Sequence, residues 1–280
     1  MEKLLLVDGS NLLFQMFYGM PARILNGEGK PIQGTLGFVG ALRKMIRKVQ
    51  PTHVAVLFDG ECHNDRTDLD ENYKANREDF SQMAEEDTPF SQLPDIYRAL
   101  DYMGICHRET TVCEADDWIA SYCRKYAGNM EIVVASQDSD FFQLIGNHVS
   151  VLRYRGENSL LCDVPYIQEK LGIEPEQYAD FKSLTGDNAD NIKGADKIGP
   201  KTAAWLLQMY GNLESVITRA EEITKPSIRA SVIKNAERLR TNYKLIYLTG
   251  KADVPFQPEE LNYQYDGVTT TQVLAAIGLR

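Results

Sequence analysis

Short, almost continuous apolar runs recur in the first half of the chain and predict buried strands. The runs at 2–7 (EKLLLV), 53–58 (HVAVLF) and 131–135 (EIVVA) are each followed by polar residues, and a fourth run lies at 149–154 (VSVLRY). Strands that are apolar on both faces are typical of a parallel sheet covered by helices on either side. We therefore expect these four runs to form such a sheet.

Two segments between the runs have the spacing of amphipathic helices. Residues 34–49 place apolar side chains three and four positions apart, and residues 115–126 repeat the pattern. Strands that alternate with helices predict a parallel sheet with helices on both faces. The expected fold class is therefore α/β.

The rest of the chain has a different character. Residues 60–95 are polar with little periodicity, which indicates a long surface insertion of the kind that is usually functional. A segment at 186–202, rich in Gly and Asp, separates the first two of four predicted helices. These helices are expected at 176–186, 200–210, 212–222 and 226–247.

Composition narrows the class of protein. The chain has 280 residues, of which 43% are hydrophobic and 25% charged, as in an ordinary globular protein. Its apolar runs are shorter than the roughly 20 residues of a membrane helix, and the run after Met1 is too short for a signal peptide. Five cysteines without a CxxC pair favour reduced thiols and a cytoplasmic location. We expect no membrane partner.

Carboxylates follow three of the predicted strands. Asp8 and Asp59 follow the first two, and Asp138 with Asp140 follows the run at 131–135. Because the carboxyl ends of parallel strands lie at one edge of the sheet, these acids are expected to meet there. Two further sets lie elsewhere, at Glu114, Asp116 and Asp117 and at Asp187 and Asp190.

Nine clustered acids would repel one another without counter-charge, and hard divalent cations such as Mg²⁺ prefer oxygen ligands. Two such ions about 4 Å apart can activate water and stabilise a leaving oxygen at phosphorus. Each acid taken singly has another interpretation, as a helix N-cap or a turn residue. The presence of acids after all three strands favours a two-metal site.

The segment 194–202 resembles a phosphate-binding loop, but Pro200 stands between Gly199 and Lys201 and no strand precedes it. A hairpin between two helices fits better. Its free backbone N–H groups would bind a phosphate without discriminating between bases. A plain connection between helices is the alternative.

Six ordered motifs together resemble the 5′-nuclease family, which includes the 5′→3′ exonuclease domain of bacterial DNA polymerase I, bacteriophage 5′-exonucleases and flap endonucleases. The resemblance spans roughly residues 3–250. The motifs are VDGSN (7–11), LFDG (57–60), YKANR (73–77), EADD (114–117), QDSDFFQL (137–144) and LTGDNADNI…IGPKTA (184–203).

The resemblance implies a PIN-like α/β core at 1–175 with a helical arch at about 60–95. It further implies a DNA-binding helical region at 176–255, with a helix–three-turn–helix motif at 186–203, and we expect a C-terminal segment at 256–280 that packs on the core. Asp8, Asp59, Glu114, Asp116 and Asp138 match the first metal cluster or its surroundings. Asp117, Asp140, Asp187 and Asp190 match the second cluster and its surroundings.

Lys74 and Arg77 match the basic pair at the base of the arch that grips the scissile phosphate. The expected DNA contacts are Lys193, Lys197, Gly199, Lys201, Thr202 and Arg66. The implied cofactors are two or more Mg²⁺ ions, with Mn²⁺ as a substitute, and K⁺ at the helix–three-turn–helix motif.

The chain departs from the family pattern at three places. Lys193 replaces a proline, Lys197 replaces a glycine, and Asp65-Arg66 replaces Phe-Arg. The insertion is also acidic, with twelve Asp or Glu residues against three Lys or Arg residues between 59 and 95. This charge disfavours a threaded strand and favours cleavage at duplex junctions.

The leading hypothesis is a metal-dependent 5′→3′ exonuclease or flap endonuclease acting on DNA, or on RNA primers paired to DNA. We expect a monomer coupled functionally to a DNA polymerase. The acidic insertion motivates the alternative of a junction-binding protein with little turnover, whereas the net charge of −10, taken alone, argues against a nucleic-acid binder. A ribonuclease for single strands is disfavoured by the hairpin at 186–203, and a phosphatase by the lack of Asp-x-Asp after the first strand.

Overall fold

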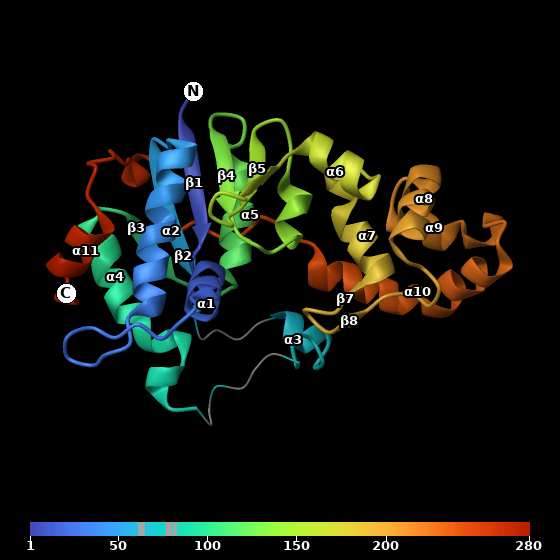
Figure 1. Ribbon diagram of the computed structural model, residues 1–280. Coiled ribbons are helices and arrows are strands. Elements are labelled where there is room, and N and C mark those ends of the chain that lie inside the picture. The colour runs from blue at the N-terminus through green and yellow to red at the C-terminus, as the bar shows by residue number, and fades with distance from the viewer. Residues whose placement is uncertain (61–64, 77–79, 81–82) are drawn as a thin grey trace.

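The computed structural model describes residues 1–60, 65–76, 80 and 83–280. Its centre is a six-stranded sheet in the order β3-β2-β1-β4-β5-β6, in which only β6 runs antiparallel to its neighbour (Figure 1). The strands are β1 (Lys3–Asp8), β2 (His53–Phe58), β3 (Cys106–Glu109), β4 (Glu131–Ala135), β5 (Val149–Arg153) and β6 (Leu160–Cys162). The expected α/β fold is confirmed.

Strand β1 lies in the middle because it is apolar on both faces. Leu4 and Leu6 pack into one core with α5, whereas Leu5 and Val7 pack into another with α1, α2, α4 and α11. The sheet is therefore covered on both faces. These helices are α1 (Gly9–Gly19), α2 (Gln33–Val49), α4 (Leu93–Tyr102), α5 (Ala115–Tyr126) and α11 (Thr270–Ala276).

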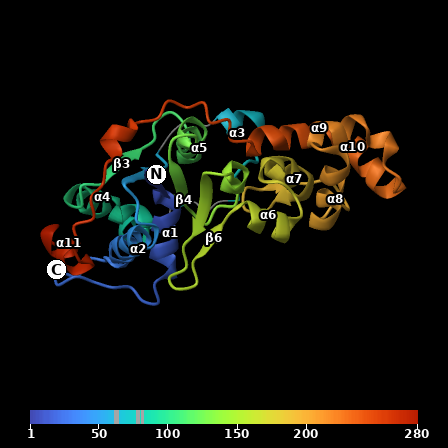
Figure 2. The same cartoon turned by 90° about the horizontal axis from the view of Figure 1, so that it is seen from above.

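A helical region extends from the β6 end of the sheet, as the view from above shows (Figure 2). Its apolar side chains continue the core beneath α5, where the Phe142 ring meets the Tyr178 ring edge-on at 5.4 Å between centroids. Its helices are α6 (Val164–Leu171), α7 (Tyr178–Thr185), α8 (Pro200–Tyr210), α9 (Leu213–Thr218) and α10 (Pro226–Ile246).

The connection between α7 and α8 is a tight hairpin of two short strands, β7 (Gly186–Asp187) and β8 (Ile192–Lys193). Gly186 has φ +84°, and a Cβ atom there would lie 2.5 Å from the backbone nitrogen of Gly194. Only glycine fits this close approach of two backbones. The hairpin thereby fixes Asp187 at the end of α7.

The polar insertion begins beside α10 and returns to the sheet at α4. Its helix α3 (Asp65–Leu69) contacts α10, and the 3₁₀ turns η2 (Glu85–Asp87) and η3 (Pro89–Gln92) lead into α4. Residues 61–64, 77–79 and 81–82 lie outside the described part, so the structure describes the expected arch only in part. Further 3₁₀ turns are η4 (Asp140–Leu144), η5 (Pro175–Gln177), η6 (Ala220–Glu222) and η7 (Pro258–Leu261).

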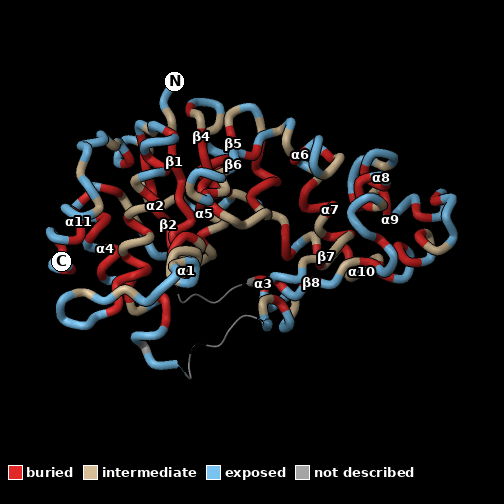
Figure 3. The backbone as a smooth tube through the Cα atoms, in the orientation of Figure 1, coloured by how far each residue is buried: buried red, intermediate tan, exposed pale blue. Residues whose placement is uncertain are grey.

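Burial follows this architecture: the strands are buried, and the exposed residues gather on loops and on outer helix faces (Figure 3). After η7, the chain crosses back to place α11 against α2 and α4. No helix among the described residues is long and apolar enough to cross a membrane. The predicted division at 175 and 255 stays a prediction.

Candidate metal centre and nuclease site

The first candidate ligands lie at the carboxyl ends of three adjacent strands. Asp8 is the last residue of β1, Asp59 follows β2, and Asp138 follows β4. Asp116, from the first turn of α5, joins them, and we call these four side chains the first group. The convergence expected from the parallel strands is therefore present.

Asp8 has two tasks in this group. One carboxylate oxygen accepts a hydrogen bond from the Asn11 backbone N–H (3.0 Å) and caps α1. The other accepts from the Ser136 hydroxyl (2.8 Å). Burial, and then the charge of Asp59, raises the pKa of Asp8 to about 7. The N-cap interpretation is thus confirmed for Asp8, and its role as a metal ligand stays a prediction.

The other carboxylates of the first group also accept hydrogen bonds or lie close to like charges. Asp59 accepts from the Ala115 backbone N–H (2.8 Å), and Asp138 accepts from the Asp140 backbone N–H (2.8 Å). Burial raises the pKa of Asp116 well above its usual range, and the neighbouring charges of Asp138, Asp8 and Asp59 raise it further. Buried carboxylates at such spacing favour either protonation or a bound cation.

Glu114 and Asp117 flank the first group and are held by protein cations. They form a capping box at the start of α5. Glu114 accepts hydrogen bonds from the Arg66 guanidinium (2.5 Å) and the Lys74 ammonium (2.6 Å). Asp117 pairs with Arg66 at 2.8 Å. Asp117 is therefore held beside Glu114, and its expected place at the second cluster and its surroundings stays a prediction.

Arg66 is placed differently from its expected role in DNA binding. The residue is buried, and its guanidinium also donates to the Leu245 carbonyl of α10 (3.1 Å). Its donors point into the protein and join α3, α5 and α10. This placement argues against a DNA contact, because the donors of Arg66 are used by Glu114, Asp117 and the Leu245 carbonyl.

A second group lies at the start of η4 and in the hairpin. One carboxylate oxygen each from Asp140, Asp187 and Asp190 lies within 4.8 Å of the others. Among the residues that the structure describes, this is the one group of three or more candidate ligands at such a separation. The group thus has the geometry of a cation site.

The second group also has the chemistry of a cation site. Asp140 Oδ1 is buried with no hydrogen-bond partner. Burial, followed by the charge of Asp138, raises the pKa of Asp140 well above its usual range. Three carboxylates with an unpartnered buried oxygen suit Mg²⁺, Mn²⁺ or Ca²⁺, which take oxygen ligands. The donor set of the second group therefore fits a divalent metal ion.

Lys74 connects the two groups. Its backbone N–H donates to the Asp190 carbonyl (3.0 Å), while its ammonium reaches Glu114. It adopts φ +58°, an uncommon backbone conformation for a residue with a side chain. Asn76 and Asn191 form two further bonds between the insertion and the hairpin, each 2.9 Å long. Arg77, its expected partner at the phosphate, lies outside the described residues.

The predicted hairpin contacts lie together at the start of α8. Lys193, Lys197, Gly199 and Lys201 are exposed, and Thr202 is half-buried. Gly199 occupies the N-cap position, followed by Pro200 in the first turn. Three exposed lysines near a helix N-terminus suit contact with a phosphate backbone.

Lys197 keeps the turn that a glycine would make. It has φ +65°, in the left-handed region that favours glycine. The replacement of the family's glycine by Lys197 therefore leaves the backbone left-handed and adds a positive charge to the turn.

Sequence reasoning missed Lys182, the cation of the second group. Lys182 lies in the last turn of α7 and forms an ion pair with Asp187. Lys182 precedes Asp187 by five residues. Helical neighbours lie three or four residues apart, so this spacing did not predict that the two side chains meet. Ser136, which holds Asp8, was missed for a similar reason, because a serine after a strand is common in turns.

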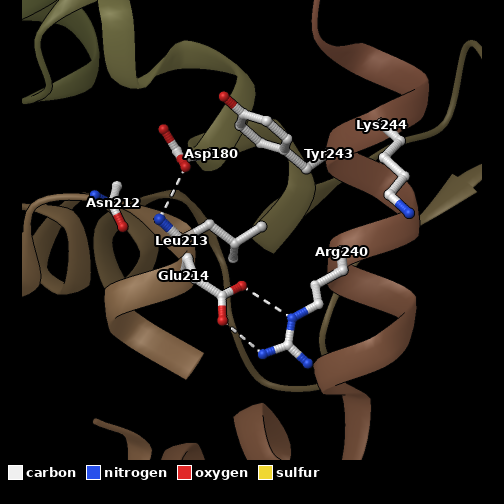
Figure 4. Close-up of a pocket in the computed structure, with 7 residues that line it drawn as sticks. All are labelled: Asp180, Asn212, Leu213, Glu214, Arg240, Tyr243 and Lys244. Carbon is white, nitrogen blue, oxygen red and sulfur yellow. Dashed lines mark hydrogen bonds and ion pairs between the residues drawn. The ribbon is translucent and has the colours of Figure 1, made fainter. Parts of the chain in front are cut away.

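A separate pocket lies between α7, α9 and α10 (Figure 4). In it, Arg240 pairs with both carboxylate oxygens of Glu214, at 2.7 and 2.9 Å, and the Asp180 carboxylate accepts from the Leu213 backbone N–H. No member of the two carboxylate groups lines it. These contacts join the three helices, and we assign the pocket no chemistry.

Two family models match adjacent parts of the chain. The 5′-3′ exonuclease N-terminal resolvase-like domain matches residues 3–172. The 5′-3′ exonuclease C-terminal SAM fold matches residues 173–267. The chain belongs to the 5′-3′ exonuclease family. The resemblance noted in the motifs, and the nuclease class expected from it, are confirmed.

The proteins similar to this chain include much longer ones and one of similar length. A DNA polymerase I from Rhizobium leguminosarum is 36% identical over 91% of the chain, but the match covers 25% of that protein. A 5′-3′ exonuclease from Aquifex aeolicus is 29% identical over 93% of the chain and 86% of its own length. The chain spans about a quarter to a third of the DNA polymerase I relatives.

Solved structures share the fold. A bacteriophage T5 flap endonuclease, in a pseudo-enzyme–product complex with DNA and metal ions, has a TM-score of 0.72 at 22% identity. The match covers 99% of this chain and 94% of that one. The catalytic core of Rad2 with a DNA substrate has a TM-score of 0.62 at 14% identity. Both likenesses concern the fold.

Proposed function

We propose that this family member hydrolyses phosphodiester bonds at 5′ ends and 5′-flap junctions of DNA, through two divalent cations held by the two carboxylate groups. The observation that carries the proposal is the second group, in which three carboxylates from η4 and the hairpin bring ligand oxygens within 4.8 Å. Each of these residues occupies a position that the family motifs implied.

The first group would hold one cation through Asp8, Asp59, Asp116 and Asp138, and the second through Asp140, Asp187 and Asp190. When bound, such cations supply a nucleophile from water and stabilise charge on phosphoryl oxygens. The chain's own residues hold the geometry. Ser136 orients Asp8, and the Ala115 N–H orients Asp59.

Lys74 would bind the scissile phosphate between the groups. Its ammonium contacts Glu114 at 2.6 Å and lies 4.9 Å from the Tyr73 ring centroid, at the base of the insertion. An ammonium beside developing negative charge stabilises the transition state. Arg77 is proposed as its partner, on the strength of the YKANR motif alone.

The hairpin would bind the duplex away from the cut. Lys193, Lys197 and Lys201, with the backbone of Gly199 and the hydroxyl of Thr202, would contact phosphates without reading bases. DNA and RNA primers paired to DNA both present such a backbone. The acidic insertion supports cleavage at junctions over threading of a single strand, since like charges repel.

The finer assignments of cofactor and partner are proposals as well. Mg²⁺ is proposed as the resident ion, with Mn²⁺ as a substitute, because all the candidate ligands are carboxylates. K⁺ at the hairpin is proposed from the motif. One hairpin carbonyl, that of Gly194, already accepts from Arg238 (2.7 Å).

We further propose a monomer in the cytoplasm that is coupled functionally to a DNA polymerase. The DNA polymerase I relatives support the coupling, because this chain matches one part of them. Free thiols at Cys106, Cys123 and Cys162 support a reducing compartment.

A junction-binding protein with little turnover is the second candidate, favoured by the acidic insertion. The two are separated by a labelled 5′-flap duplex in Mg²⁺, Mn²⁺ or chelator, with binding and cleavage measured on the same sample. Single-stranded RNA of matched sequence serves as the control substrate. Metal-dependent cuts near the junction support the nuclease, whereas tight binding without cuts supports the binder.

A further inference from the structure

The second carboxylate group contains a cation supplied by the chain itself. The Lys182 ammonium contacts Asp187 Oδ2, and both side chains are largely buried, with 14% and 12% of their surfaces exposed. The charge of Lys182 also favours ionised Asp140. The ammonium therefore contacts one of the three carboxylates that would hold a metal ion and acts on a second through its charge.

We propose that Lys182 is an internal stand-in for the second divalent cation, so that this ion must compete with a resident ammonium and binds more weakly than it otherwise would. The proposal rests on the proposed function, which places a cation at Asp140, Asp187 and Asp190. It adds a residue that sets how strongly that cation is held.

The position of Lys182 in the fold supports this role. It extends from the last turn of α7, where the Gly186 N–H donates to its carbonyl and fixes the backbone. Gly186 packs against Gly194, so the hairpin cannot shift Asp187 away from α7 without breaking a backbone contact. The ammonium can instead move, because a lysine side chain has four rotatable bonds and the fixed backbone does not restrain them.

The two carboxylate groups differ in how protein cations neutralise their negative charge. The cations around the first group, Lys74 and Arg66, contact Glu114 and Asp117, which flank it. The cation at the second group contacts a member of the trio directly. A divalent ion at the first group therefore competes less with a protein cation. We expect the two ions to bind with different affinities.

The net charge of the second group indicates the direction in which Lys182 changes its affinity for a cation. Three carboxylates and one ammonium carry a net charge of −2, whereas without the ammonium they carry −3. An ion at this position would lie within a few ångströms of the ammonium, where a unit charge is worth on the order of a tenfold change in affinity or more. Removal of the ammonium also frees Asp187 Oδ2 as a ligand.

The test is a calorimetric titration of the full chain with Ca²⁺ alone, without DNA. Lys182→Met removes the charge and keeps the length of the side chain, while Lys182→Arg keeps the charge. Lys170→Met, on the exposed face of α6, is the matched control. We expect Lys182→Met to tighten the weaker cation site by about tenfold or more, with the other two variants unchanged.

Thermal unfolding provides a second measurement. In chelator, Lys182→Met should unfold at a lower temperature than the wild type, because the three carboxylates lose their counter-charge. Saturating Ca²⁺ should remove that difference. A role as a simple tie between α7 and the hairpin predicts instead a loss of stability that Ca²⁺ does not restore.

Unchanged or weakened binding at the second site in Lys182→Met would overturn the proposal, as would the absence of a second site in both proteins. Flap cleavage by the wild type in Mg²⁺ is measured in parallel. Normal cleavage with unchanged cation affinity refutes the role of Lys182 alone. Absence of cleavage in any metal refutes the proposed function instead.

Discussion

The Lys74 ammonium lies 2.6 Å from Glu114 Oε1, although 40 residues separate them in sequence. The carboxylate holds the lysine beside the first group, and the Asp190 carbonyl holds its backbone beside the second. In the proposed function, Glu114 would position Lys74, and the Lys74 ammonium would meet a phosphate.

Replacement of Lys74 by Met is expected to lower the rate of flap cleavage by about 10²–10³-fold, the usual cost of one electrostatic donor at a reacting centre. Affinity for the duplex should change by only a few-fold, because the hairpin lysines supply that contact. Single-turnover cleavage and filter binding in Ca²⁺ measure the two quantities. Lys170→Met is the control, and an equal loss of binding and rate would contradict the assignment.

Removal of Arg66 is expected to destabilise the fold. Arg66→Gln leaves Glu114 and Asp117 partly buried without their main counter-charge, which costs about 3–5 kcal/mol for a buried pair. Urea unfolding in chelator measures the loss. A variant of normal stability that fails only to bind DNA would instead restore the role expected from the sequence.

The stability of the metal-free protein should fall as pH rises from about 4 to about 7. The pKa of Asp8 is about 7 in the fold, against 3.8 as its usual value. Because the folded state holds the proton more tightly in this window, the free energy of unfolding decreases as that proton is lost. Divalent metal should reverse the trend, since it binds the ionised form.

Melting temperatures at pH 5, 6, 7 and 8, in chelator and in Mg²⁺, measure this effect. Asp8→Asn is the informative variant because asparagine still caps α1. It should flatten the profile in chelator. An unchanged profile in Asp8→Asn would mean that another group carries the dependence.

We expect Lys197 to contribute positive charge for duplex binding rather than stability of the fold. In Lys197→Gly the left-handed backbone suits glycine, so stability should stay within about 1 kcal/mol of the wild type. Duplex binding should weaken, and the slope of its salt dependence should fall by about 1. Binding measured at several salt concentrations provides the slope. No change in slope would remove Lys197 from the DNA contacts.

Much of the sheet follows from the sequence because its central strands are apolar on both faces. The predicted runs at 53–58 and 131–135 coincide with β2 and β4. Strand β3, with the sequence CHRE, was not predicted. It is an edge strand that pairs only with β2 and is half solvated, so it lacks an apolar run.

The site was predictable to the extent that strand ends define it. Asp8, Asp59 and Asp138 meet because their strands are adjacent and parallel. The ion pairs were not predictable, since Arg66 and Glu114 are brought together by the packing of α3 between α5 and α10. Residues such as Arg66 therefore matched a motif position while their contacts depended on tertiary structure.

The most direct test of the account is the cleavage of a labelled 5′-flap duplex by the wild type and by Asp138→Asn. Asparagine keeps the acceptor for the Asp140 N–H but removes the charge. Asp163→Asn, at the N-cap of α6, is the matched control. The account predicts Mg²⁺-dependent cuts at the junction that leave 5′-phosphates and are lost only in Asp138→Asn. Full cleavage by that variant would contradict it.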